Sequence, residues 1–314
     1  MSRVAVRLDA SAEIGTGHWR RMSNLLDALR PEYVVFIVRS NAPRNPMFHH
    51  ANVRFLQNGD EIAISTQICI NESIDLLIID LLIYPTGYLA RLRAELTCRI
   101  VSFHEYRDWD VSSDLVINYN TFDGFADVSA PHVLAGPAYC ILNPAILSLV
   151  GSPTSEEVLV TFGGADPSRF AESFIKEVAP RVPWIPFVLH LGPFSHQSAS
   201  NLPANVRLSR PSESFFHLMA TCRAAITAAG NAMYELIYLG NPALVVAHNS
   251  HQAEFATTAA RMGAARYFGS APKVDWAALA SSLLDASVPP RLEPPLIDGL
   301  GLDRIVTRIN QLAA

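Results

Sequence analysis

The sequence predicts an α/β protein with two doubly wound parallel sheets, whose carboxyl-terminal strand ends face a central cleft. Short β-branched runs alternate with helical patterns along most of the chain, which is the pattern of parallel sheets. The length of 314 residues favours two domains over one. Residues 151–155, Gly-Ser-Pro-Thr-Ser, have the composition of a linker. We therefore expect one domain over residues 1–150 and another over residues 151–314.

The first half contains β-branched runs that predict strands and periodic segments that predict helices. Strands are expected at residues 3–8, 33–38, 53–56, 76–79, 100–103 and 115–118. Helices are expected near residues 18–29, 61–70 and 87–96. Because ligands of such sheets bind beyond the carboxyl ends of the strands, the loops that leave these ends are the first candidates for function.

The second half repeats this alternation without a fixed period. Strands are expected at residues 158–162, 187–191, 206–208, 224–227 and 243–246. Helices are expected near residues 167–178, 214–219, 231–239, 252–262 and 275–284. Residues 286–300 are rich in proline and predict an extended segment. A last helix from Leu302 is expected to pack on either domain.

Composition excludes several classes of protein. Hydrophobic residues make up 50% and charged residues 17% of the chain, which excludes a disordered chain. The formal net charge of -5 and the lack of Lys/Arg runs argue against a nucleic-acid partner. A phosphate-bearing ligand must then be held by a few directed groups.

The sequence also predicts a cytoplasmic protein without a membrane span. The longest apolar stretches, 76–79 and 243–247, are too short to cross a bilayer, and the charged, alternating N-terminus does not resemble a secretory signal. Cys69, Cys98, Cys140 and Cys222 form no CxxC pair, so we expect reduced, structural thiols. We expect a monomer or a weak oligomer.

The loop at residues 9–18 joins the first strand to the first helix. Gly15 and Gly17 allow a ligand to approach the backbone, and the helix start favours an anionic group. His18 is a candidate general base because imidazole titrates near neutrality, although a capping or surface histidine is the alternative. Arg21, one turn later, is placed either to reach a phosphate or to be exposed.

Two loops of the second half have the composition of phosphate-binding loops. Gly163 and Gly164 precede a proline at a helix start, which leaves backbone N–H groups for a pyrophosphate. Asp166 in the same loop is either a ligand group or a helix cap. In residues 228–235, small residues lead into a helix whose Glu235 is placed to accept the hydroxyls of a ribose, or to complement the helix dipole.

Polar side chains follow further strands. The loop at residues 247–252 carries several amide and imidazole groups, which is unusual for a plain connection. Asp80 ends an apolar strand and is a cleft group or a helix cap. The pair His104-Glu105 follows the next strand, as an acid and base or as a solvated loop. Asn118 and Asn120 bind sugar hydroxyls or make a turn.

Several common catalytic motifs are missing. The chain has no HExxH, no cysteines that partner its histidines, no GxSxG elbow and no P-loop. We therefore expect neither a metal nor a cofactor.

Taken together, the loops resemble the PseG family, UDP-sugar hydrolases of pseudaminic acid biosynthesis that are grouped with SpsG-type spore-coat proteins and are distantly similar to MurG glycosyltransferases. The resemblance begins with Arg7-Leu8-Asp9-Ala10-Ser11, Ile14-Gly15-Thr16-Gly17-His18 and Arg21. It continues, in the family's order, through Leu76-Leu77-Ile78-Ile79-Asp80, Ile100-Val101-Ser102-Phe103, Asp114-Leu115-Val116-Ile117-Asn118-Tyr119-Asn120, Gly136-Pro137-Ala138-Tyr139, Gly163-Gly164-Ala165-Asp166, Gly230 and Glu235.

The resemblance implies a GT-B fold and metal-independent, inverting hydrolysis of a UDP-linked 2,4-diacetamido-2,4,6-trideoxy sugar, with release of UDP. It implies that residues 1–150 form the sugar or acceptor side with His18 as the base, and that residues 151–314 bind the nucleotide. The implied substrate-binding residues are Arg7, Asp9, Gly15, Thr16, Gly17, Arg21, Asp80, His104, Glu105, Asn118 and Asn120. The implied nucleotide-binding residues are Gly163, Gly164, Asp166, Ala229, Gly230, Asn231, Glu235, His251 and Gln252.

The chain departs from the family pattern on the sugar side. The departures are Leu81-Leu82-Ile83-Tyr84, His104-Glu105, Asn143 and His251-Gln252. Two alternatives therefore stay open. One is a GT-B glycosyltransferase that uses a UDP- or CMP-sugar donor, and the other is a non-catalytic nucleotide-sugar-binding protein.

Overall fold

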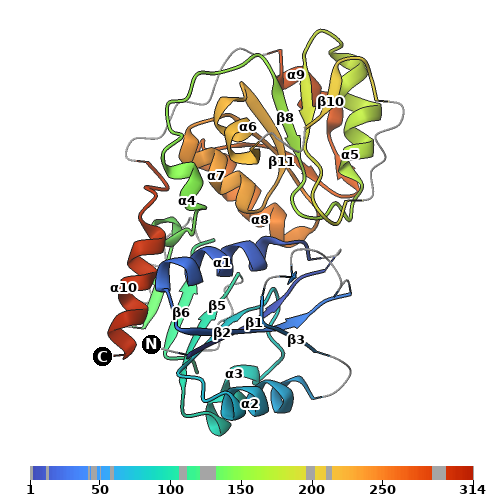
Figure 1. The fold of residues 1–314 in the computed structure, drawn as a ribbon. Helices are drawn as coiled ribbons and strands as arrows, with labels where there is room; N and C mark the ends of the chain where they lie inside the picture. Colours follow the sequence, from blue (N-terminus) through green and yellow to red (C-terminus); the bar gives the residue numbers. More distant parts are fainter. Residues whose placement is uncertain are drawn as a thin grey trace. The chain divides into compact units, whose positions relative to one another are not determined.

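The computed structural model describes residues 3–11, 14–41, 43, 48–49, 51–56, 60–105, 112–120, 132–195, 202–209, 214–284 and 295–313 (Figure 1). The chain divides into two compact units. The first comprises Met1–Ile141 with Leu300–Ala314, and the second comprises Leu142–Gly299. Within the described residues each unit contains a 7-stranded sheet.

The sheet of the first unit has the strand order β3-β2-β1-β4-β5-β6-β7 and is parallel throughout its described pairings. Its strands are β1 (Arg3–Asp9), β2 (Tyr33–Arg39), β3 (Val53–Phe55), β4 (Leu76–Asp80), β5 (Arg99–Phe103), β6 (Leu115–Asn118) and β7 (Val133–Ala135). Its helices are α1 (Gly17–Leu29), α2 (Glu61–Asn71), α3 (Tyr88–Glu95) and α10 (Gly301–Ala313), with a 3₁₀ turn, η2 (Pro137–Tyr139).

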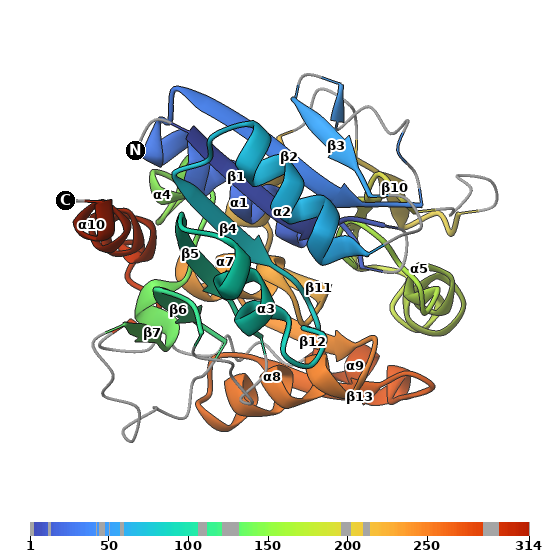
Figure 2. The same cartoon turned by 90° about the horizontal axis from the view of Figure 1, so that it is seen from below.

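Side-chain alternation decides which face of this sheet each residue reaches. Ala5, Leu77 and Ile79 belong to the apolar core beneath α2 and α3. Because successive strand residues point to opposite faces, Leu8 and Asp80, which are in register, point to the other face, which α1 covers (Figure 2). The first polar residue at the end of β4 is thus directed toward α1.

The sheet of the second unit has the order β10-β9-β8-β11-β12-β13-β14, with only the last described pairing antiparallel. Its strands are β8 (Val158–Thr161), β9 (Phe187–Leu189), β10 (Val206–Leu208), β11 (Ala224–Ala228), β12 (Ala243–Ala247), β13 (Arg266–Ser270) and β14 (Lys273–Val274). Its helical elements are α4 (Pro144–Leu147), α5 (Phe170–Ser173), η3 (Phe174–Val178), η4 (Ala179–Arg181), α6 (Phe215–Thr221), α7 (Asn231–Leu239), α8 (Ser250–Arg261) and α9 (Trp276–Ser282). Phe170 of α5, Phe174 of η3 and Leu279 of α9 help to fill the core on one face of the sheet.

The predicted strands and helices are confirmed, with bounds that shift by a few residues. The helix expected at residues 167–178 begins only at Phe170, because Arg169 has a left-handed conformation (φ 54°) after a turn closed on Asp166. The short strands β7, β13 and β14 were not predicted. Residues 286–294 of the expected extended segment lie outside the described residues.

The contacts divide the chain differently from the predicted boundary between residues 150 and 151. Helix α4 packs against α6, which places the stretch from Leu142 onward in the second unit. Helix α10 packs against α1, η2 and β5, which returns it to the first unit. The linker composition at residues 151–155 therefore lies within the second unit.

Candidate functional site

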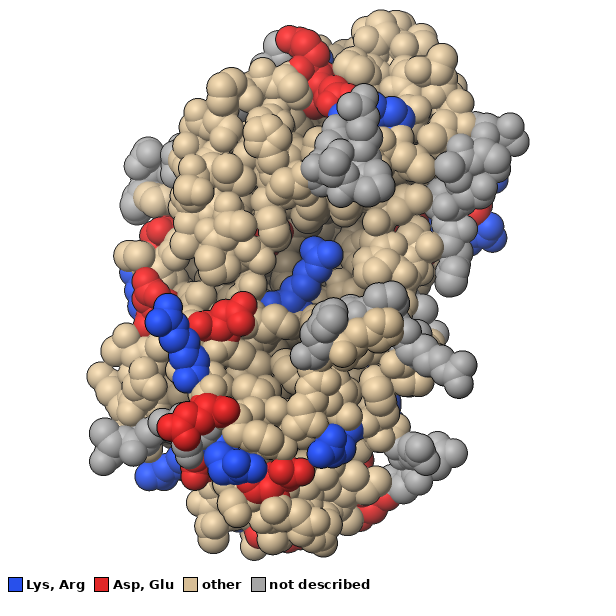
Figure 3. Space-filling model, viewed as in Figure 1, with Lys and Arg blue, Asp and Glu red and all other residues tan. Residues whose placement is uncertain are grey.

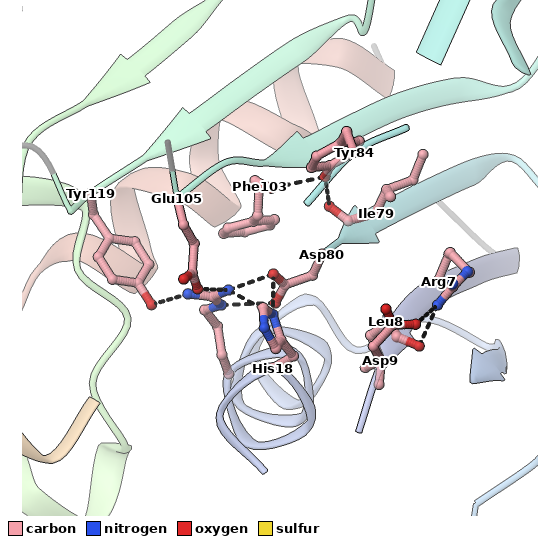
Figure 4. A network of polar contacts seen from close by, with 11 residues as sticks. Arg7, Leu8, Asp9, His18, Ile79, Asp80, Tyr84, Phe103, Glu105 and Tyr119 are labelled. Carbon is pink, nitrogen blue, oxygen red and sulfur yellow. Dashed lines mark hydrogen bonds and ion pairs between the residues drawn. The ribbon is translucent and has the colours of Figure 1, made fainter. Parts of the chain in front are cut away.

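His18 and Asp80 form a buried pair in the first unit. His18 lies in the first turn of α1 and Asp80 ends β4, so the α1-facing direction of Asp80 brings the two side chains together. His18 Nδ1 lies 2.7 Å from Asp80 Oδ1 (Figure 4). The two residues are 5% and 0% exposed, so bulk water does not screen the interaction.

The partners of Nδ1 determine which ring nitrogen carries the proton. A contact of 2.7 Å with a carboxylate oxygen requires that Nδ1–H donates, since two lone pairs at that distance repel. Arg21 Nη2 also lies 3.0 Å from Nδ1, but an N–H cannot donate to a nitrogen that already carries a proton. Nε2 has no hydrogen-bond partner among the described residues and is therefore the basic nitrogen of the neutral ring.

Arg21 anchors the same carboxylate. Its Nε donates to Asp80 Oδ2 at 2.8 Å and its Nη2 donates to Asp80 Oδ1. Its Nη2 also reaches Glu105 Oε1 at 3.1 Å, and its Nη1 donates to the hydroxyl of Tyr119. Helix α1 is thus tied to residues at the ends of β4, β5 and β6. Arg21 is therefore buried and hydrogen-bonded within the protein, and it does not occupy the exposed position that was one of the two alternatives from the sequence.

Burial and charge act in opposite directions on this pair. Burial alone lowers the pKa of His18, but the charge and hydrogen bond of Asp80 outweigh it, so the pKa is raised above its ordinary value of 6.5. Burial raises the pKa of Asp80, but Arg21 and His18 hold it well below its ordinary value of 3.8. Asp80 therefore remains a carboxylate, and His18 becomes a free base only above its raised pKa.

His104 directly follows β5 and contacts Tyr84 and Ser102. Its ring stacks on Tyr84 with centroids 4.4 Å apart, and its Nε2 lies 3.0 Å from Ser102 Oγ. The single O–H of Tyr84 is shared between the carbonyl oxygens of Ile79, at 2.9 Å, and Phe103, at 2.8 Å, which joins the ends of β4 and β5. In the sequence, Tyr84 stood out only as a departure from the family pattern. In the structure, it connects the ends of two neighbouring strands.

Arg7 and Asp9 lie on the opposite face of the sheet from His18. Arg7 is 1% exposed, and its Nε donates to Glu61 Oε1 at 2.8 Å while its Nη1 donates to Asp9 Oδ1 at 2.6 Å. The Tyr88 hydroxyl donates to the same oxygen of Glu61 at 3.0 Å. Because strand residues alternate, Arg7 and Asp9 join α2 and α3 rather than the His18 network. The substrate-binding role that the family resemblance implies for them stays a prediction.

The remaining candidate residues of the first unit lie at the start of α1 and in the turn at the end of β6. Gly15 has a φ of 85°, a conformation that favours glycine, and Thr16 is the N-cap of α1 without a side-chain cap bond. Gly17 is the first residue of α1. Asn118 Oδ1 accepts from the backbone N–H of Asn120 at 3.1 Å, so it makes the turn that the sequence left as one alternative.

The glycine loop of the second unit follows β8. Gly163 has a φ of 91°. A Cβ on Gly192, after β9, would lie 2.2 Å from the carbonyl oxygen of Gly163 and 2.6 Å from the carbonyl carbon of Gly164. Asp166 accepts from the N–H groups of Phe170 and Ala171 at 2.8 Å each, so it caps α5. Gly192, which the sequence did not single out, is thus the close neighbour of this loop.

The loops after β11 and β12 lie at adjacent strands of the same edge. Ala229 is buried, Gly230 is the N-cap of α7, and Asn231 begins that helix. Glu235, in the second turn of α7, is 9% exposed.

His251 and Gln252 lie in the first turn of α8. His251 is 5% exposed, and its ring packs edge-on against Phe255. Gln252 Oε1 accepts from the backbone N–H of His248 at 2.9 Å, which closes the loop on itself. The strand order β8-β11-β12 therefore makes all three sequence-predicted nucleotide loops neighbours within this unit.

Charge on the face seen in Figure 3 is mixed rather than basic. Acidic and basic side chains lie next to one another over the first unit, and most of the visible surface is uncharged. Within the described ranges, no three His, Cys, Asp or Glu side chains gather in a way that would hold a metal ion. No described helix is long and apolar enough to cross a membrane.

Tyr119 is the main site residue that sequence reasoning missed. It directly follows β6, as Asp80 ends β4, and its position beside Asn118 was the available signal. Alternation places it on the side of the sheet where α1 lies, and its hydroxyl accepts from Arg21.

Comparison with known proteins identifies relatives of the whole chain. No protein-family model matches. The chain is 28% identical over 337 aligned residues to the spore coat polysaccharide biosynthesis protein SpsG of Bacillus subtilis strain 168, with 98% of each chain covered. Its structure is similar to UDP-GlcNAc 2-epimerase from Neisseria meningitidis bound to UDP-GlcNAc (TM-score 0.64, 13% identity, covering 98% of this chain and 100% of that one). It is also similar to MurG of Acinetobacter baumannii (TM-score 0.62, 12% identity, covering 98% and 99%). These structural likenesses establish the predicted GT-B fold, with two Rossmann-like units.

Proposed function

We propose that the chain hydrolyses a UDP-linked amino sugar of the 2,4-diacetamido-2,4,6-trideoxyhexose type and releases UDP, in surface polysaccharide or nonulosonic acid synthesis. The observation that carries the proposal is the buried His18–Asp80 pair, which leaves Nε2 as a free base. The likeness to a spore coat polysaccharide biosynthesis protein and to a structure with bound UDP-GlcNAc supports a nucleotide-sugar substrate.

In the proposed reaction, His18 Nε2 takes a proton from a water molecule as the water oxygen forms a bond to the anomeric carbon. The bond from that carbon to the β-phosphate oxygen breaks, and its electron pair leaves with UDP. Attack opposite the leaving group inverts the anomeric centre. UDP is a good leaving group, so the protein needs to supply little beyond a base, alignment and N–H groups for the departing charge.

The proposal assigns nucleotide binding to the second unit. The N–H groups near Gly163, Gly164 and Gly230 suit a pyrophosphate, and Glu235 suits the ribose hydroxyls. Since the chain has a net charge of -5 and no Lys/Arg runs, the proposal assigns phosphate recognition to such directed groups.

A glycosyltransferase is the second candidate, because MurG has the same fold and the sugar-side segment at residues 81–84 is apolar-rich. In that case His18 deprotonates an acceptor hydroxyl instead of water. The two candidates differ in whether UDP is released from a sugar donor when no acceptor is present.

The test is UDP release, followed by mass spectrometry, from the UDP-linked diacetamido sugar and from UDP-GlcNAc, with and without added sugar acceptors. Rapid release that yields free sugar supports hydrolysis, and release that depends on an acceptor contradicts it. We expect His18→Ala to lower the rate by about 10²–10⁴-fold, the usual contribution of a general base, while UDP affinity in calorimetry is unchanged.

The matched control is His49→Ala, because His49 is an exposed imidazole of the same unit. It should leave both quantities unchanged. UDP binding without turnover of any nucleotide sugar would instead indicate a binding protein.

A further inference from the structure

The guanidinium of Arg21 connects helix α1 to three strand ends of the first unit. It is 4% exposed and contacts Asp80 at the end of β4, Glu105 after β5 and Tyr119 after β6. Its Cζ also lies 5.6 Å from the centroid of the Phe103 ring and 5.3 Å from that of Tyr119. The buried, ring-lined setting makes each of these polar contacts stronger than it would be in water.

The charges around His18 nearly balance. Asp80 and Glu105 are each negative and Arg21 is positive, so the group has one net negative charge when His18 is neutral and none when it is protonated. Arg21 thus opposes one of the two carboxylates that favour a protonated ring. Among the described residues, the charged groups that face His18 from α1, β4 and the segment after β5 are these three, and Tyr119 faces Arg21 from the end of β6.

We infer that Arg21 and Tyr119 are positioning residues for His18: they hold the Asp80 carboxylate so that it accepts from Nδ1–H, which leaves Nε2 as the nitrogen that accepts a proton. Without the bidentate hydrogen bonds from Arg21, the Asp80 carboxylate is free to rotate away from Nδ1, and the His18 ring is free to adopt the other tautomer. The inference rests on the proposed function for its catalytic consequence and on the contacts alone for the tautomer.

This assignment differs from a phosphate-binding role for Arg21 in a measurable way. A positioning residue acts on kcat, because it affects the base, and leaves UDP affinity unchanged. A phosphate ligand acts on UDP affinity and KM. The contacts favour the first role, because Nε and both Nη atoms of Arg21 already donate to protein oxygens.

The experiment compares the wild type with Arg21→Lys, Arg21→Gln and Tyr119→Phe by ¹⁵N nuclear magnetic resonance of the His18 ring, alongside kcat and UDP affinity. Signals of His18 are assigned by their loss in His18→Gln. The control is Arg20→Gln, because Arg20 is the neighbouring residue of the same helix and is exposed.

In the wild type we expect the neutral ring to carry its proton on Nδ1. Arg21→Gln should move the titration of the ring to higher pH, because a positive charge is lost beside it, and should mix the two tautomers. Arg21→Lys keeps the positive charge but loses the bidentate contact with Asp80. It should therefore mix the two tautomers, with a smaller change in the midpoint of the His18 titration. We expect kcat to fall by about 10²-fold in both, the cost of a ~1 Å misplacement, with UDP affinity unchanged.

Tyr119→Phe keeps the Arg21–Asp80 pair, so it tests the inference even if the Arg21 variants do not fold. We expect a smaller loss of kcat and a partial change of tautomer. Unchanged tautomer and kcat in Tyr119→Phe and in every folded Arg21 variant would overturn the inference, as would a loss confined to UDP affinity.

The two proposals fail separately. The resonance measurement needs no substrate, so the expected tautomer changes without turnover of any nucleotide sugar would contradict the proposed function alone. Normal turnover by Arg21→Gln would contradict the inference alone.

Discussion

At the scale of single residues, Asp80 determines both the orientation and the proton affinity of His18. Its carboxylate is fully buried, accepts from Nδ1 at 2.7 Å and is itself held by Arg21. The hydrogen bond selects the tautomer, and the charge raises the pKa of the ring. The two effects can be separated by an isosteric substitution.

We expect turnover by the wild type to increase as the pH rises through the pKa of His18, which lies above 6.5, because only the neutral ring accepts a proton. In Asp80→Asn the negative charge is lost, so this rise should move to lower pH. The maximum rate should fall by about 10²–10⁴-fold, because the amide no longer favours one tautomer. The measurement is kcat against pH for both proteins. A rise that stays at the same pH in Asp80→Asn would show that His18 is not the titrating base.

Much of the His18 network follows from the sequence, whereas the place of Arg7 does not. His18 starts a helix and Asp80 ends a neighbouring strand, so the rule for strand ends brings them to the same edge. Arg7 and Asp9 belong to the same motif in the sequence, yet alternation turns them to the face under α2 and α3. Their grouping with His18 came only from the family resemblance, which does not specify the face of the strand. Applying the two-residue period of strands would have separated them.

At the scale of elements, the glycine loop after β8 depends on close packing by the next loop along the sheet. The missing side chain of Gly192 allows it to lie against the peptide between Gly163 and Gly164. Unlike Gly163, Gly192 does not have a positive φ, so its requirement is for space and not for backbone freedom.

We expect Gly192→Ala to displace the glycine loop, since its Cβ would lie 2.2 Å from the carbonyl oxygen of Gly163. The free energy of unfolding should fall by about 1–3 kcal/mol, the cost of overpacking, and UDP affinity by about 10-fold. Denaturant unfolding and calorimetry measure the two quantities. Gly230→Ala is the stability control, because open space surrounds its Cβ, and it should cost less than about 1 kcal/mol. Equal stability of the two variants would show that the close contact is not required.

The strands and helices that the sequence predicted share strong periodicity, and those it missed do not. Strand β7 has only three residues, and β13 contains Gly269 and is half-buried along its length, so neither gives the buried β-branched run of a central strand. The start of α5 was misplaced because Pro167 is typical of a first helical turn, whereas Arg169 interrupts the helix here.

At the scale of the whole molecule, the two units have separate cores and separate proposed tasks. The sequence predicted two sheets but not that the chain passes from the first unit to the second after Ile141 and returns after Gly299. A linker composition is a local signal, while the assignment of α10 depends on contacts with α1 and β5, hundreds of residues away. No local pattern contains that information.

If nucleotide binding belongs to the second unit, saturating UDP should protect amides of residues 142–299 from hydrogen exchange more than those of the first unit. At a ligand concentration of about 100 times Kd, the added stability is about 2.7 kcal/mol for a unit that binds only when folded. Mass spectrometry of exchanged peptides measures this difference. Protection confined to peptides of β1, α1 and β4 would contradict the assignment.

The position of α10 in the chain affects how the protein is made. Residues 301–313 complete the packing around α1, yet the ribosome makes them only after all of the second unit. While translation continues, the buried Ile305 and Ile309 are missing from the first unit, and the apolar surface that they cover stays open to water. The usual order, in which the amino-terminal part of a nascent chain finishes folding first, is therefore reversed for the unit that carries His18.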